Sequence, residues 1–254
     1  MAITDPTDIA NLLMWYDADD ASTFTFYTGA DVSTWADKSG NGFTLVTNDS
    51  NNRPTRVSAE LNGRAVVRAL DRSEGRGMYY PSAQTGFSRS QPLTVFAVCQ
   101  FDDANESGLF EFGHTTGGAS VVRRSDNQLL MCDAPHGTGY PNTVLTVGTS
   151  TPAIVTVQYN GSSSYGRVDQ AAGFTSQNPG SAGVTGFVMI LNRASGSGAR
   201  LLGYIAEFVV YEAALSSTDR DDVEAYLNAK WFAAAATSRI IRGRTIQHRV
   251  ALTR

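Results

Sequence analysis

The chain has 254 residues, a formal net charge of −4, 42% hydrophobic residues and 17% charged residues. This composition is typical of a globular protein with few surface charges, and the length allows one large domain or two small ones. No apolar run approaches the roughly 20 residues that span a bilayer, so we expect no membrane partner. The N-terminus has neither a basic start nor a long apolar stretch, so we predict no secretory signal.

Short apolar runs, rich in β-branched residues and separated by polar turns, indicate strands along the whole chain. Residues 92–101 are apolar on both faces, which is typical of a strand in the middle of a sandwich. Other strands are predicted at residues 12–18, 43–47, 65–70, 108–113, 119–124, 128–132, 153–159, 165–169, 186–192 and 204–212. This series predicts an all-β fold, built as an antiparallel two-sheet sandwich.

One helix is predicted near the C-terminus, within residues 214–232. Ser216 is placed to cap its N-terminus, and Asp219 lies in the electropositive first turn. The helix carries one apolar stripe, formed by Val223, Tyr226, Leu227 and Trp231. We expect it to pack across the edge of the sandwich.

The stretch WADKSGNGFTL, residues 35–45, combines a tryptophan, a charge pair and a glycine-rich turn. Asn41-Gly42 is a strong signal for a turn with positive φ. Asp37 and Ser39 can bond to backbone amides of the same loop. We therefore interpret the stretch first as a tight corner between two strands.

The alternative for this corner is a calcium site. Asp37, Asn41 and a distant Asp17 or Asp19 would supply the hard oxygen ligands that calcium prefers. Calcium takes about 6–8 oxygens, and the loop offers only two or three side chains, so the structural turn is favoured. No other cofactor is expected. Cys99 and Cys132 lie in apolar segments and are predicted to be buried free thiols.

Four stretches carry a resemblance to a known family: LLMWYDADDASTF, VSTWADKSGNG, RPTRVSAELNGRAVVR and IAEFVVYEAALSSTDRDDVEAYLNAKW. In this order they resemble the concanavalin A-like (LamG-like) jelly-roll domains, especially those of bacteriophage and prophage structural proteins and bacterial surface proteins. The resemblance implies two curved antiparallel sheets, and members often bind carbohydrate, sometimes with calcium. It divides the chain into a leader (1–10), a jelly-roll domain (11–232), and a linker with a C-terminal arm (233–254).

The carboxylates give no catalytic pair in the sequence. Glycanases on this fold carry acids at alternating positions of one strand, whereas Glu207 and Glu212 are five apart and fall on opposite faces. Glu111 stands alone among apolar neighbours, and DRDDVE is expected on the solvated side of the helix. The three histidines, His114, His136 and His248, accompany no G-x-S-x-G nucleophile motif. We therefore predict that the protein is not an enzyme.

Sugar binding is harder to dismiss than catalysis. Tyrosines expected in loops beside Asn, Asp and Arg can stack on a sugar ring and bond its hydroxyls. The candidates are Tyr79, Tyr80, Tyr140 and Tyr165. The alternative is that these rings pack against neighbouring loops. This structural interpretation is favoured over sugar binding.

The last residues form a basic and apolar arm. Residues 233–254 contain five arginines and no acid, which leaves 15 of the 20 basic and all 24 acidic side chains in residues 1–232, a balance of −9. Such a segment can add a strand to a sheet edge or lie in a groove of an acidic partner. The predicted docking residues are Arg239, Ile240, Ile241, Arg242, Arg244, Ile246, Arg249, Val250 and Leu252.

The arm leaves other interpretations open. A frayed, disordered terminus is one, and docking on a second copy to form a homo-oligomer is another. Nucleic-acid binding is disfavoured because aromatic residues are absent and arginines are sparse.

The sequence thus predicts a non-enzymatic bacteriophage virion protein, on the head exterior or the tail, assembled in the host cytoplasm. Its partners would be capsid or tail proteins through the arm, and host-surface glycan through the domain. The alternative is a carbohydrate-binding module, with calcium, that acts without a particle. A glycan hydrolase would need a carboxylate pair.

Overall fold

The computed structural model describes residues 2–47, 53–71, 77–80, 86–113, 119–126, 128–133, 144–171, 174–177, 183–192 and 200–233. The predicted arm (239–254), Tyr140 and the three histidines lie outside these residues. The described part is mostly β-strand in antiparallel sheets, with one C-terminal α-helix, so the prediction of an all-β fold is confirmed at this level. No helix among these residues is long and apolar enough to cross a membrane.

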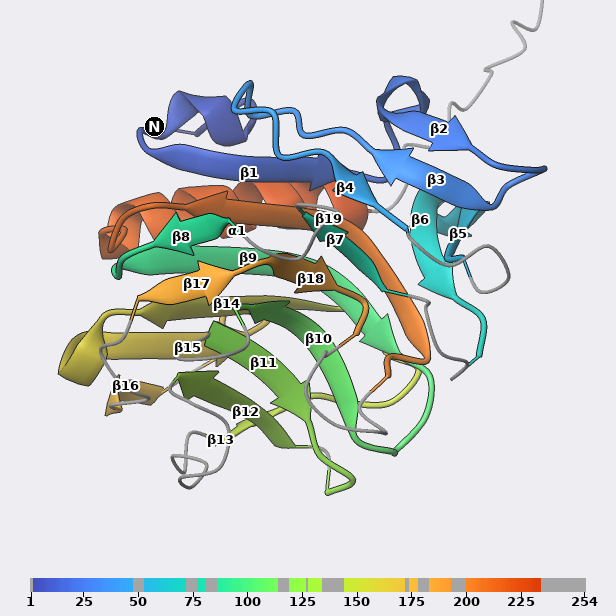
Figure 1. Cartoon of the computed structure of the whole chain (residues 1–254). Coiled ribbons are helices and arrows are strands. Elements are labelled where there is room, and N and C mark those ends of the chain that lie inside the picture. The colour runs from blue at the N-terminus through green and yellow to red at the C-terminus, as the bar shows by residue number, and fades with distance from the viewer. Residues whose placement is uncertain are drawn as a thin grey trace, which may run out of the picture.

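The described strands form two large sheets and one small one (Figure 1). The 8-stranded sheet runs, in spatial order, β16 (Phe174–Gln177), β15 (Ser164–Val168), β14 (Ala153–Tyr159), β9 (Leu93–Phe101), β19 (Gly203–Tyr211), β6 (Arg64–Ala69) and β5 (Thr55–Leu61), with β1 (Leu12–Asp17) also paired to β19. The 9-stranded sheet runs β13 (Val144–Thr146), β12 (Gln128–Asp133), β11 (Ala119–Arg123), β10 (Ser107–Phe112), β18 (Val188–Ile190), β7 (Met78–Tyr80), β4 (Leu45–Val46), β3 (Val32–Trp35) and β2 (Phe24–Phe26).

A two-stranded ribbon, β8 (Phe87–Arg89) with β17 (Val184–Gly186), completes the strands. Three short 3-10 helices, η1 (Pro6–Asp8), η2 (Ala21–Thr23) and η3 (Gly161–Ser163), lie in connections. β2, β3, β5, β7, β8, β13, β16 and β17 were not predicted from the sequence. Most of them are only three or four residues long, which is too short for apolar alternation to reveal them.

The main core lies between the two large sheets. Phe208 of β19 contacts Phe110 and Phe112 of β10, with ring centroids 5.4 Å and 6.2 Å apart. Val95 and Cys99 of β9 belong to the same buried cluster. Cys99 is a buried free thiol, as predicted, and burial raises its pKa. The sheets therefore pack face to face through alternate residues of their strands.

The helix α1 (Ser217–Trp231) covers the outer face of the 8-stranded sheet. Ser216 caps it as predicted, because its Oγ accepts a hydrogen bond of 3.1 Å from the amide of Asp219. Its apolar stripe packs on the second faces of β9 and β19, which include Phe96 and Val209. The expected position at the sandwich edge was therefore wrong. The second apolar face of β9 is the surface on which the helix packs.

Candidate functional site

The corner at residues 35–45 is held by one carboxylate. Asp37 Oδ1 accepts hydrogen bonds from the backbone amides of Trp15 and Ser39, at 3.0 and 2.8 Å. Asp37 Oδ2 accepts from Ser39 Oγ at 2.7 Å and from the amide of Phe43 at 3.2 Å. Gly40 and the following turn glycine have φ values of 88° and 80°, which glycine adopts without strain. The hydrogen bonds support the turn interpretation.

The same corner covers an irregularity in β1. The pairing of β1 with β19 shifts register between Leu12 and Met14, so that Leu13 is an extra residue in a β-bulge. Asn41 Nδ2 donates to the carbonyl oxygens of Leu12 and Leu13, each at 3.0 Å. Asn11, just before the bulge, has a φ of 65°, a left-handed conformation that asparagine tolerates. Bulges often lie beside functional sites.

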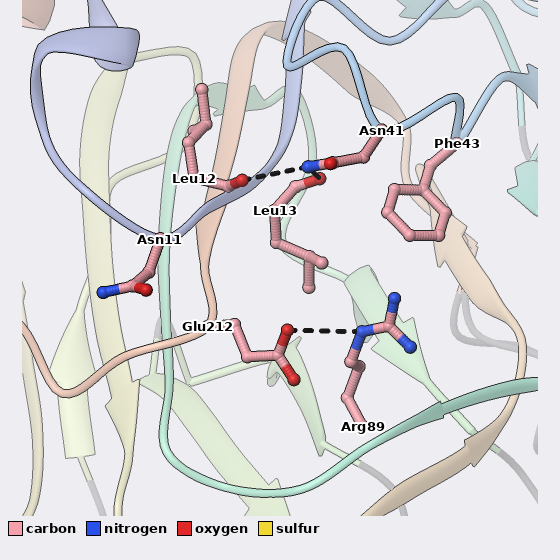
Figure 2. A pocket seen from close by; sticks show the side chains of 7 residues that line it. All are labelled: Asn11, Leu12, Leu13, Asn41, Phe43, Arg89 and Glu212. Atoms are coloured by element: carbon pink, nitrogen blue, oxygen red, sulfur yellow. Dashed lines mark hydrogen bonds and ion pairs between the residues drawn. The ribbon is translucent and has the colours of Figure 1, made fainter.

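A pocket of about 400 Å³ opens at this bulge (Figure 2). Its walls come from the start of β1, from the corner, from β8 and from the residue after β19. The lining residues are Asn11, Leu12, Leu13, Asn41, Phe43, Arg89 and Glu212. The backbone amide of Glu212 donates to the carbonyl of Asn11 at 2.9 Å, which joins two of these walls. A volume of this size accommodates a small ligand.

An arginine and a glutamate form an ion pair in the wall of the pocket (Figure 2). Arg89 Nε lies 3.5 Å from Glu212 Oε2, and Arg89 Nη1 donates to the carbonyl of Ser88 at 2.6 Å. The guanidinium lies 5.3 Å from the ring centroids of both Phe43 and Phe87. Two aromatic rings and one carbonyl thus hold the cation in place, which reduces the entropy lost when it binds a ligand.

Sequence reasoning did not find this pocket. Asn41 was considered as a turn residue or a calcium ligand, and Glu212 was considered only as half of a catalytic pair, which was rejected. Arg89 stands in a three-residue strand with no periodic signal. The signal that was present is the glycine-rich corner, whose asparagine faces the bulged strand 28 residues earlier.

A second polar cluster lies beneath α1, around Glu207 of β19. Glu207 is fully buried, yet its Oε1 accepts from Trp15 Nε1 at 2.7 Å and from the hydroxyl of Tyr226 at 2.9 Å. Its Oε2 accepts from Trp231 Nε1 at 2.6 Å and lies 2.8 Å from Lys230 Nζ. Burial raises the pKa of Glu207, and the Lys230 ammonium opposes that shift. These contacts fasten the last turn of the helix to the sheet.

The cluster continues to the corner through two lysines. Asp17 Oδ2 lies 2.8 Å from Lys230 Nζ and 3.2 Å from Lys38 Nζ. Lys38 Nζ also lies 2.8 Å from Asp20 Oδ2, and it holds the pKa of Asp20 down at about 2. Lys38 therefore pairs with Asp17 and Asp20 rather than with its sequence neighbour.

These contacts bear on the calcium hypothesis for Asp17, Asp37 and Asn41. Two ammonium groups already neutralise Asp17, both oxygens of Asp37 accept protein hydrogen bonds, and Asn41 turns its amide nitrogen toward carbonyls. In the described part of the chain, no group of three or more His, Cys, Asp or Glu side chains is placed to hold a metal. The geometry gives calcium at this corner no support.

The predicted tyrosine platform is not assembled. Tyr79 and Tyr80 lie on β7 rather than in a loop, and Tyr79 is buried in a cluster with Phe187 and Met189. Tyr80 packs its ring on Phe43, 5.1 Å between centroids. The short strand β7 was missed from the sequence, which is why these rings were expected in a loop.

The fourth candidate, Tyr165, is partly buried. Tyr165 lies on β15 under Arg220, whose guanidinium is 4.2 Å from the ring centroid. Of the four candidates, Tyr79, Tyr80 and Tyr165 are thus in three different packing environments, and Tyr140 falls outside the described residues.

Of two further buried acids, Glu224 differs from expectation. Glu224, expected on the solvated side of the helix, is fully buried and accepts from Thr156 Oγ1 at 2.5 Å and from Arg167 Nε at 2.7 Å. Glu111 is fully buried on β10. The sequence grouped Glu224 with the charged, solvated face of the helix, but Arg167 of β15 provides a cation that pairs with this carboxylate under the helix.

No protein-family model and no curated protein matches the sequence. Solved structures do match. A Trypanosoma rangeli sialidase in complex with sialic acid has a TM-score of 0.55 and 14% identity over 87% of this chain and 33% of its own. An arabinofuranosidase complexed with arabinofuranosyl-alpha-1,2-xylobiose has a TM-score of 0.56 and 15% identity, over 87% of this chain and 59% of its own. A GH54 α-L-arabinofuranosidase has a TM-score of 0.52 at 14% identity, over 78% and 51%.

These likenesses correct the prediction that the protein is not an enzyme, because the proteins that resemble its structure are glycosidases. The prediction considered only acids on one strand, whereas a catalytic pair can be assembled from separate segments. At 14–15% identity the likeness shows a shared fold, and the chain spans about a third of the sialidase and just over half of each arabinofuranosidase.

Proposed function

We propose that the chain is a bacteriophage virion protein that displays a lectin-like, concanavalin A-like (LamG-like) jelly roll and binds host-surface glycan in the pocket at Arg89 and Glu212. The observation that carries the glycan part is this pocket. It combines a fixed cation, a carboxylate and two asparagine amides with the ring of Phe43. Few but convergent polar groups beside an aromatic ring are typical of a small-molecule site, and sugar hydroxyls can donate to the carboxylate and accept from the guanidinium.

The comparisons support the ligand class. The sialidase is described in complex with sialic acid, and one arabinofuranosidase with an arabinofuranosyl xylobiose. Both ligands are sugars. The jelly-roll family is proposed from the sequence resemblance, and the antiparallel face-to-face sheets support it.

The virion part of the proposal depends on the sequence. The four stretches that resemble phage jelly rolls include the residues of the Glu207 cluster, which hold α1 to the sheet. Residues 239–254 would then attach the domain to capsid or tail proteins through their arginines and aliphatic side chains.

A glycan array tests the first part. The full-length protein should bind a defined set of glycans, and Arg89→Ala should lose at least about tenfold in affinity, since a charge-assisted hydrogen bond contributes on that scale. If Arg89→Ala and the wild type bind glycans with the same affinity, this pocket is not the glycan site. The control is Arg124→Ala, which removes an exposed arginine paired with Asp126 outside the pocket.

Sedimentation with particles that lack this protein tests the second part. The full-length chain should pellet with them, and a chain of residues 1–238 should not. Pelleting of both would show that the domain itself attaches. Pelleting of neither, with glycan binding intact, would favour a carbohydrate-binding module that acts without a particle.

Hydrolysis is the second candidate function, favoured by the fold shared with glycosidases. Glu212 is the only carboxylate among the described lining residues, so it would be the acid or the base. Release of sugar from a bound glycan, lost in Glu212→Gln while binding persists, would establish it.

A further inference from the structure

The charge of the pocket limits which sugars it can hold. Arg89 and Glu212 contribute one positive and one negative charge, and the other lining residues are neutral. Their closest atoms are 3.5 Å apart, which is an ion-pair distance but too long for a good hydrogen bond. Both groups therefore keep hydrogen-bonding capacity for a ligand.

The guanidinium has donors to spare. Nη1 uses one N–H on the carbonyl of Ser88, and Nε has no hydrogen-bond partner in the structure, although it is buried. The rings of Phe43 and Phe87 fix the guanidinium plane, so the donors that face the pocket are already oriented. An oriented donor binds without first losing rotational freedom.

Glu212 supplies the acceptors. Its side chain is 46% exposed, and its backbone amide is anchored on Asn11. The pocket thus presents a carboxylate beside a guanidinium, with Asn41 on the wall away from this pair and Asn11 joined to Glu212 through the backbone. Each sugar hydroxyl is both a donor and an acceptor. Two adjacent hydroxyls can donate to Glu212 while accepting from Arg89.

An acidic sugar meets a different environment. Its carboxylate would pair with the remaining donors of Arg89, and the Glu212 carboxylate, 3.5 Å from the same guanidinium, would then face a second anion at close range. Like charges brought together in a partly desolvated site cost binding free energy and are a common device of specificity.

We propose that this pocket selects a neutral saccharide unit, bound through adjacent hydroxyls by Arg89 and Glu212, and that Glu212 excludes sialic acid and other acidic sugars. This inference rests on the proposed glycan-binding function and specifies the ligand class of the same site. Of the two sugars named for the similar structures, sialic acid is acidic and the arabinofuranosyl xylobiose is neutral.

Calorimetric titration of the full-length protein tests it with two probes, arabinofuranosyl xylobiose and sialyllactose. The wild type should bind the neutral probe more tightly. Glu212→Gln removes the charge at constant shape, so it should lower the affinity for the neutral probe about tenfold. The ratio of the affinities for the neutral probe and sialyllactose should therefore shrink or invert. Asp126→Asn, which neutralises an exposed carboxylate paired with Arg124 outside the pocket, should leave both affinities unchanged.

Three results would overturn the inference. Tighter binding of sialyllactose by the wild type would contradict the exclusion of acidic sugars. An unchanged preference in Glu212→Gln would show that Glu212 does not select. If neither probe binds, array glycans decide: a hit limited to acidic sugars contradicts this inference alone, and the absence of any hit contradicts the proposed function as well.

Discussion

The indole nitrogen of Trp231, in the last turn of α1, donates a hydrogen bond of 2.6 Å to Glu207 in β19. The two residues are 24 apart in sequence, and their bond joins the helix to the centre of the 8-stranded sheet. Lys230 and Trp15 complete the same cluster. The contacts thus place a buried carboxylate under two tryptophans and a lysine.

Removal of Glu207 should therefore destabilise the domain strongly. Glu207→Ala leaves the Lys230 ammonium and two indole N–H groups without their buried acceptor, and breaking a buried ion pair on one side costs about 3–5 kcal/mol. Urea denaturation measures this loss. Glu212→Ala, which truncates a half-exposed glutamate five residues later, is the matched control and should change the free energy of unfolding by less than about 1 kcal/mol. Equal losses of unfolding free energy in the two variants would contradict the assignment of Glu207 as the buried residue that holds the helix to the sheet.

Asp37 should be a structural residue of the corner and not a metal ligand. Asp37→Ala removes the acceptor of four hydrogen bonds, so we expect a loss of about 2–4 kcal/mol in the free energy of unfolding. Thermal unfolding of the wild type should be the same with calcium and with a chelator. A melting temperature that falls on chelation in the wild type, but not in the variant, would restore the calcium hypothesis.

Acid stability should depend on Asp20. Its pKa is lowered from 3.8 to about 2 in the folded state, mainly by the hydrogen bond to Lys38. A lowered folded-state pKa contributes stability above the ordinary value, and this contribution is lost as the pH falls from about 4 to about 2. Asp20→Asn should be less stable than the wild type at pH 6, and the gap should close near pH 2. A gap that stays constant with pH would argue against the pairing.

The pair of Arg167 and Glu224 should show strong coupling. Arg167→Met leaves Glu224 buried without its cation and should cost about 3 kcal/mol. The double variant with Glu224→Leu should recover much of that loss, since well-packed apolar residues often replace a buried pair without penalty. A double-mutant cycle by denaturation measures the coupling. Additive single losses would mean that the two side chains act independently.

The sequence predicts the parts of the fold whose signal is local. β9 is apolar on both faces because one face meets the opposite sheet and the other meets α1, and the helix shows its cap and stripe in neighbouring residues. The role of Glu207 is not local. Its partner Trp15 lies 192 residues away, and nothing at Glu207 itself indicates that contact.

The pocket was missed for the same reason. It combines the corner at Asn41, a three-residue strand ending at Arg89 and the residue after β19, and only the fold brings them together. Conversely, Tyr79 and Tyr165 are of a residue type that is common in sugar sites, but their rings pack against neighbouring side chains. Residue type alone led to the hypothesis of a sugar ligand, but the pocket itself is visible only in the tertiary structure.

The proposal that glycan binds in the pocket at Arg89 and Glu212 is tested most directly by titration of isotope-labelled protein with a glycan identified on the array, followed by NMR. We predict that the side-chain amide signals of Asn11 and Asn41 and the Nε–H signal of Arg89 shift together and saturate with one affinity. These three groups line the pocket from three separate segments. Saturable shifts confined to another face of the protein, with the three signals unmoved, would contradict the assignment of the glycan site to this pocket.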